Sequence, residues 1–91
     1  MYKSTKKYLI YGRVQGVGFR AFVVKIANAF DINGTVKNLE DSSVAVIATG
    51  SNENHNSFKE QLELGNKFSR VDKILVEQMD LLNFSQFIVE L

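Results

Sequence analysis

A glycine-rich segment at residues 11–20, YGRVQGVGFR, has the residue types needed to bind a phosphate-sized anion. Glycine readily adopts positive φ angles, so Gly16 and Gly18 allow successive backbone N–H groups to turn inward and form a concave anion site. A helix predicted to begin after them adds free N–H groups and the positive end of its dipole. Arg20 supplies a permanent positive charge and a fork of donors that matches phosphate oxygens. The segment therefore predicts a phosphate-binding turn between a strand and a helix.

Other interpretations of these glycines stay open from the segment alone. A tight turn followed by a solvated arginine is a common outcome for glycines after a strand. Residues 16–21 also match the loose dinucleotide-binding pattern G-x-G-x-x-A, although that pattern belongs to parallel βαβ units and this chain continues with a predicted hairpin. The Walker phosphate loop is excluded because no Lys-Ser/Thr pair follows the glycines.

The composition indicates one soluble domain spanning residues 1–91 and argues against several classes of partner. The formal net charge of +1 gives no overall attraction to nucleic acid or to an anionic membrane. With no cysteine and one histidine, the chain lacks a disulfide framework, a thiol nucleophile and the ligands of an ordinary zinc site. The apolar run near the start, YLIY, is too short for a signal peptide or a membrane span. We expect a cytoplasmic monomer that binds neither nucleic acid nor membrane and holds no metal.

The hydrophobic pattern predicts the elements that position the glycine-rich turn. Alternating and β-branched residues mark strands, and helical spacing of apolar residues marks helices: strands at 7–14, 34–40, 44–50 and 69–79, helices at 20–30 and 51–64. The first helix carries Phe22, Ile26 and Phe30 on its apolar face. Asn33 or Gly34 is expected to end it in the left-handed conformation. A short final segment, SQFIVEL, is a candidate for an additional edge strand.

The resulting order, β-α-β-β-α-β, predicts an α+β fold of the ferredoxin-like type. Two helices that each carry one apolar face can cover one side of an antiparallel sheet. In this arrangement the loop after the first strand and the strand after the first helix meet at the same region of the molecule. The glycine-rich turn is therefore expected beside the strand at residues 34–40.

The motifs IYGRVQGVGFR and GTVKNLEDSSVAVIATG together resemble the acylphosphatases, small enzymes that hydrolyse carboxyl–phosphate mixed anhydrides. The similarity runs from about residue 7 to the last residue and includes SRVDKI and FIV near the end. The resemblance implies a ferredoxin-like sandwich in which Arg20 binds the substrate phosphate and Asn38 orients the attacking water. The loop whose backbone wraps the phosphate oxygens is implied to comprise Gln15, Gly16, Val17, Gly18 and Phe19.

The chain departs from the family pattern at three positions. Thr35 stands where an aromatic residue is usual, Ser42 replaces the usual glycine of the hairpin turn, and Asn66 stands where proline often follows glycine. These differences bear on local packing and turn geometry, and they leave the two implied catalytic side chains unchanged.

Few groups suffice for the implied reaction, because the carboxylate of an acyl phosphate leaves without needing a proton. Positioning and charge stabilisation then dominate the barrier. The neutral amide of Asn38 can bind a water without adding negative charge, and a phosphate oxygen of the substrate can accept its proton. Arg20 and the loop N–H groups would stabilise the equatorial oxygens, so no metal or other cofactor is expected.

Other polar residues are interpreted as solvated or structural. His55 lacks a Ser/Asp partner at recognisable spacing and is expected to be solvated at the polar start of the second helix. Glu40 and Asp41 are expected to be solvated acids at a turn. Arg70 and Asp72 lie two apart on a strand and are expected to pair on one face.

Two further functions remain alternatives to an acylphosphatase acting on a small-molecule acyl phosphate. The first is a non-catalytic module that binds phosphate or a phosphoprotein in the same cradle. The second is an RNA-binding domain, because RNA-recognition folds share this element order. However, the inner strand VAVIATG has none of the aromatic residues on which such domains stack bases.

Overall fold

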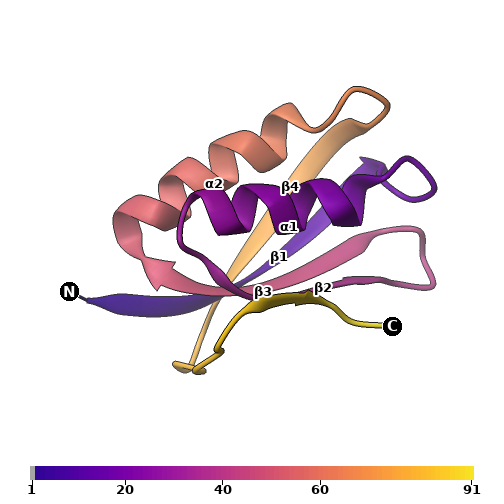
Figure 1. The fold of residues 1–91 in the computed structure, drawn as a ribbon. Helices are drawn as coiled ribbons and strands as arrows, with labels where there is room; N and C mark the ends of the chain where they lie inside the picture. Colours follow the sequence, from indigo (N-terminus) through magenta and orange to yellow (C-terminus); the bar gives the residue numbers. More distant parts are fainter. Residues whose placement is uncertain (1) are drawn as a thin grey trace.

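The protein forms one five-stranded sheet with two helices on the same face (Figure 1). A computed structural model describes residues 2–91. Its elements in chain order are β1 (Lys3–Arg13), α1 (Phe19–Ala29), β2 (Asn33–Asn38), β3 (Val44–Ser51), α2 (Asn52–Leu64), β4 (Arg70–Met79) and β5 (Phe87–Val89). The sheet order is β4-β1-β3-β2-β5, which confirms the predicted ferredoxin-like α+β fold. Neither helix within residues 2–91 has the length and apolar run needed to cross a bilayer.

The additional edge strand predicted near the end of the chain is present as β5, and its pairing makes the sheet mixed. β5 pairs in parallel with β2, with Val36 opposite Val89, whereas the other neighbouring strands pair antiparallel. The chain leaves β4 at one edge and returns to the opposite edge (Figure 1). Asn33 holds this returning segment, because its Nδ2 donates to the Phe84 carbonyl oxygen at 3.1 Å.

β1 begins at Lys3, earlier than the predicted start at residue 7. Polar residues at the start of the strand obscure the alternation of apolar and polar residues by which a strand is recognised in the sequence. Thr5 is nevertheless fully buried, and its hydroxyl lies 2.6 Å from the hydroxyl of Thr49 on β3. Both hydroxyls also bond to the backbone of Leu82: Thr49 donates to its carbonyl oxygen at 2.8 Å and Thr5 accepts from its N–H at 2.9 Å, so these buried groups have partners.

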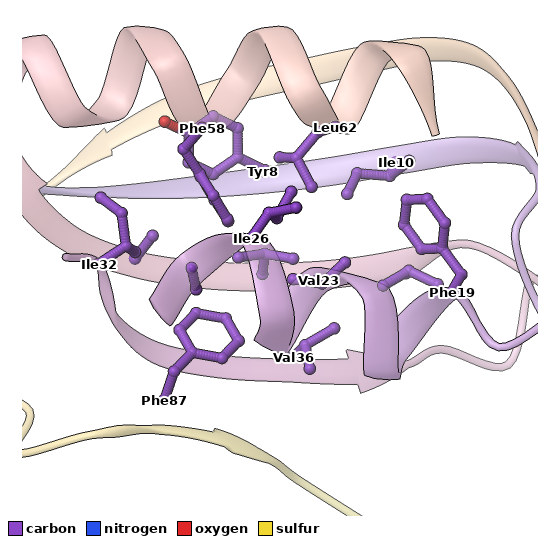
Figure 2. Close-up of a cluster of buried hydrophobic side chains, with 14 of the residues drawn as sticks. Tyr8, Ile10, Phe19, Val23, Ile26, Ile32, Val36, Phe58, Leu62 and Phe87 are labelled. Atoms are coloured by element: carbon purple, nitrogen blue, oxygen red, sulfur yellow. The ribbon is translucent and has the colours of Figure 1, made fainter. Parts of the chain in front are cut away.

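The hydrophobic core lies between the helices and the sheet (Figure 2). The buried helix residues fall on one face of each helix: Phe19, Val23, Ile26 and Ala27 on α1, and Phe58 and Leu62 on α2. Phe22 and Phe30, also predicted for the core, are partly buried and pack against it. Because Phe19 is both buried and the first residue of α1, core packing fixes the position of the helix start and of the loop before it.

The exit from α1 differs from the prediction. Asp31, with a φ of 55°, is the left-handed residue, rather than Asn33 or Gly34. Gly34 lies inside β2, where an added Cβ would collide with the carbonyl oxygen of Ile47 on β3. The glycine is therefore required by the close approach of two strands, and not by the end of the helix.

His55 is buried, which contradicts the prediction of a solvated residue; it is 1% exposed. Its Nδ1 lies 2.7 Å from the Tyr8 hydroxyl and its Nε2 lies 2.9 Å from the Ser4 carbonyl oxygen. Because a carbonyl can only accept, Nε2 carries the proton and Nδ1 accepts from the tyrosine. Burial lowers the pKa of His55 below its usual value. The imidazole joins α2 to β1.

Candidate active site

Two glycines shape the loop between β1 and α1. Gly16 and Gly18 have φ angles of 73° and 75°, in the left-handed region that favours glycine. An added Cβ would meet no atom within 4 Å at Gly16, and at Gly18 only the Asn66 Nδ2 at 3.8 Å. The requirement for glycine here is therefore the backbone conformation and not a lack of space.

The start of α1 leaves its backbone donors free. Gly18 is the N-cap and has no side chain to accept from them, and the first turn contains no acidic residue. The N–H of Phe22 bonds to the Gly18 carbonyl oxygen at 3.1 Å, which is the first bond of the helix. The N–H groups of Phe19, Arg20 and Ala21 precede that bond and have no partner within the helix. The helix dipole adds positive potential at the same point.

A cavity of about 290 Å³ opens against this helix start. Its walls come from the loop, the first turn of α1, the end of β2 and β5: Val14, Gln15, Gly16, Gly18, Phe19, Arg20, Ala21, Asn38 and Val89. The structure thus brings Arg20 and Asn38 to one cavity, although they lie 18 positions apart in the chain. No acidic side chain is among the lining residues. Charge and shape both suit an anion.

Asn38, the last residue of β2, lines this cavity and carries a buried acceptor atom. Its side-chain Oδ1 is inaccessible to solvent and has no hydrogen-bond partner among residues 2–91. Buried polar atoms in native structures nearly always have a partner, so an orphaned acceptor calls for an explanation. Because a water molecule does not reach Oδ1 in this side-chain conformation, the amide has to turn before a water in the cavity can donate to that oxygen.

Gln15 contributes to the site in a way that its sequence position did not reveal. Its Nε2 donates to the carbonyl oxygens of Leu39 and Ser43, each at 2.9 Å. These bonds fasten the loop to the turn between β2 and β3, which lies at the same end of the molecule (Figure 1). The residue after Asn38 is thereby fixed relative to the loop.

Val17 is the one residue of the predicted loop that does not line the cavity. Its carbonyl oxygen instead accepts a hydrogen bond from Asn66 Nδ2 at 2.9 Å. Sequence reasoning noted Asn66 only as a departure from the family pattern. The contact could have been suspected from the sequence, because Asn66 places a side-chain donor where the family pattern often has proline.

Glu40 and Asp41 are exposed, as predicted, and Asp41 also shapes the turn between β2 and β3. The Asp41 carboxylate accepts from the hydroxyl and N–H of Ser43, and these bonds hold the pKa of Asp41 below its usual value. Ser42, beside it, has a φ of 75°, so serine occupies a left-handed position that glycine would fill without strain. Arg70 and Asp72 pair at 2.9 Å on the exposed side of β4, as predicted.

The chain is similar to acylphosphatases over most of its length. A model of the acylphosphatase family matches residues 6–89. An acylphosphatase from Clostridium acetobutylicum is 43% identical over 76 residues, covering 81% of this chain and 84% of that protein.

Solved structures give the same family. An acylphosphatase from Bacillus subtilis superposes with a TM-score of 0.94 at 34% identity, covering 99% of this chain and 100% of the other. One from Coxiella burnetii superposes with a TM-score of 0.92 at 30% identity, covering 97% of this chain and 93% of the other.

Proposed function

The chain belongs to the acylphosphatase family and hydrolyses acyl phosphates, and we propose that Arg20, Asn38 and the 15–19 loop carry out this reaction. The observation that supports this assignment most strongly is the single cavity lined by both side chains and by the loop. Binding, orientation of water and charge stabilisation are then assigned to different parts of one site.

The phosphate group of the substrate binds at the start of α1. Arg20 and the unpaired N–H groups of the loop and first turn donate to its equatorial oxygens. These donors are held in place before the substrate arrives, so little reorganisation accompanies the reaction. As negative charge shifts during cleavage, the same donors stabilise it.

Asn38 holds the attacking water. Its side chain lines the cavity, and once the amide turns to face the cavity its Oδ1 accepts one hydrogen bond from the water and directs a lone pair of the water oxygen toward phosphorus. An amide suits this task because a carboxylate would repel the phosphate. The proton of the water passes to a phosphate oxygen, the bond from phosphorus to the acyl oxygen breaks, and the products are a carboxylate and inorganic phosphate.

The reaction is proposed to need no metal ion. Magnesium prefers carboxylate and phosphate oxygens, and the cavity wall supplies cationic and neutral donors instead of acids. Arg20 takes the charge-neutralising role that a metal has in kinases. The protein is further proposed to act as a monomer in the cytoplasm, which size-exclusion chromatography and cell fractionation would check.

Release of phosphate from benzoyl phosphate, measured with excess chelator, tests this assignment. The Arg20→Gln variant should lose on the order of 10³-fold in kcat/KM, because it removes the charged donor from the transition state. Asn38→Ala should lose about 10²-fold in kcat and retain its affinity for inorganic phosphate.

The matched control is Lys25→Gln, which removes one positive charge from the exposed face of the same helix. Its activity should stay within about twofold of the wild type, since an exposed, screened charge contributes little. Full activity of Arg20→Gln, or wild-type activity that the chelator abolishes, would contradict the proposal. Tight phosphate binding without turnover would instead support a non-catalytic phosphate-binding module.

A further inference from the structure

Asn66 joins the turn after α2 to the phosphate-binding loop. Its Nδ2 lies 2.9 Å from the Val17 carbonyl oxygen, although the two residues are 49 positions apart. The orientation of the amide is fixed by this contact, because turning it over would set its oxygen against the carbonyl oxygen.

The backbone around Asn66 is itself held in place. Gly65 ends α2 with a φ of 71°. The N–H of Asn66 then donates to Ser69 Oγ at 2.9 Å, and the N–H of Ser69 donates to the Asn66 carbonyl oxygen at 3.2 Å. This compact turn gives the Asn66 side chain a fixed base from which to reach the loop.

The contact determines the direction of one peptide group in the loop. The Val17 C=O and the Gly18 N–H belong to the same planar trans peptide and point in opposite directions. Asn66 holds the Val17 C=O in the direction of the turn after α2, and neither Val17 nor Asn66 lines the cavity. The Gly18 N–H points the opposite way, and Gly18 does line the cavity.

We infer that Asn66 is a positioning residue that orients the Gly18 N–H for binding the substrate phosphate. This inference rests on the proposed function of the loop. No other side chain in residues 2–91 donates to the Val17 carbonyl oxygen. Gly16 and Gly18, on either side of Val17, are both left-handed, so the peptide group would be free to rotate if the Asn66 side chain were removed. Asn66 does not contact the cavity itself, so its effect is transmitted through the peptide group.

Calorimetric titration with inorganic phosphate, the reaction product, tests the inference with two variants. Asn66→Ala removes the donor and should raise the dissociation constant on the order of tenfold, the loss expected for one misplaced hydrogen bond to a charged ligand. Asn66→Asp keeps the shape but sets an oxygen against the carbonyl oxygen, and it should weaken binding at least as much. In both variants the KM for benzoyl phosphate should rise in parallel.

Asn33→Ala is the matched control. It removes the same kind of contact, an asparagine Nδ2 on the Phe84 carbonyl oxygen at 3.1 Å, from the opposite end of β2. It should lower the melting temperature as Asn66→Ala does and leave the phosphate dissociation constant unchanged.

The outcomes separate this inference from the proposed function. If both Asn66 variants fold and bind phosphate as tightly as the wild type does, Asn66 is merely structural and the inference is wrong. If the wild type itself binds no phosphate, the proposed site fails and the inference fails with it. Weakened binding in both Asn66 variants but not in Asn33→Ala supports the positioning role.

Discussion

The two helices of this protein begin in opposite ways. At the start of α2, the Ser51 side chain accepts from the N–H of Asn54 at 3.1 Å, and Glu53 places a negative charge in the first turn. Both features are typical of a helix that satisfies its own donors. At the start of α1, the cap is Gly18, and the first turn carries Arg20 and no acid.

The difference agrees with the proposed phosphate site, because the helix start assigned to binding is the one without a side-chain cap or an acidic residue. A side-chain cap or an acid at the start of α1 would satisfy local rules for helix stability, and it would also occupy the donors that a phosphate needs. The proposed phosphate site therefore depends on the uncapped start of α1 and not on the fold as a whole.

Placing an acidic residue in the first turn of α1 should greatly reduce the hydrolysis of acyl phosphates. In Ala21→Glu, a carboxylate enters the first turn at an exposed residue that lines the cavity. It should favour the helix by about 0.5 kcal/mol and lower kcat/KM for benzoyl phosphate by about 10²-fold, because it competes with and repels the phosphate. Steady-state kinetics and thermal unfolding measure the two effects.

Two controls sharpen this prediction. Asn28→Glu adds the same charge near the other end of α1, at an exposed position, and should change kcat/KM by less than about twofold. Ser51→Ala at the start of α2 should cost about 1 kcal/mol of stability and leave kcat/KM unchanged. An Ala21→Glu enzyme with wild-type kinetics would show that the start of α1 is not the anion site.

Lowering the pH should reduce the free energy of unfolding through His55 on α2. We expect this effect to be smaller than the effect of Ala21→Glu on activity. Burial lowers the pKa of His55 in the folded protein, so the unfolded chain takes up a proton first as the pH falls. Stability from this residue is fully present above the ordinary pKa of about 6.5 and is lost below it, at up to about 1.4 kcal/mol per pH unit for one proton.

Urea denaturation between pH 5 and pH 8 measures this loss. Since the chain has one histidine, a slope just below pH 6.5 is attributable to His55. His55→Phe should be less stable at pH 7, because it leaves the Tyr8 hydroxyl without this partner, but its stability should not change with pH in that window. A wild-type curve that is flat from pH 6.5 to pH 5 would contradict the account.

The sequence allowed the helix-facing core and the glycine-rich turn before α1 to be predicted because both depend on local patterns. The apolar spacing of α1 and the glycines before it follow from backbone and periodicity rules. The burial of His55 was missed, since its polar neighbours in the sequence gave no sign of the Tyr8 hydroxyl and Ser4 carbonyl that satisfy it.

Contacts between distant residues were the other part that the sequence could not supply. The bond from Asn66 to Val17, and those from Gln15 to the turn after Asn38, depend on how separate elements pack. Likewise, the parallel pairing of β5 depends on the path of the returning chain and not on the short apolar run that forms the strand.

The most direct test of the central claim is a titration of ¹⁵N-labelled protein with inorganic phosphate, followed by amide NMR signals. We predict that the signals of residues 16–21, at the start of α1, move together with one dissociation constant, while those of residues 52–54, at the start of α2, stay in place. Fixed signals at residues 16–21, or a response centred elsewhere on the molecule, would contradict the assignment of the α1 start as the phosphate site.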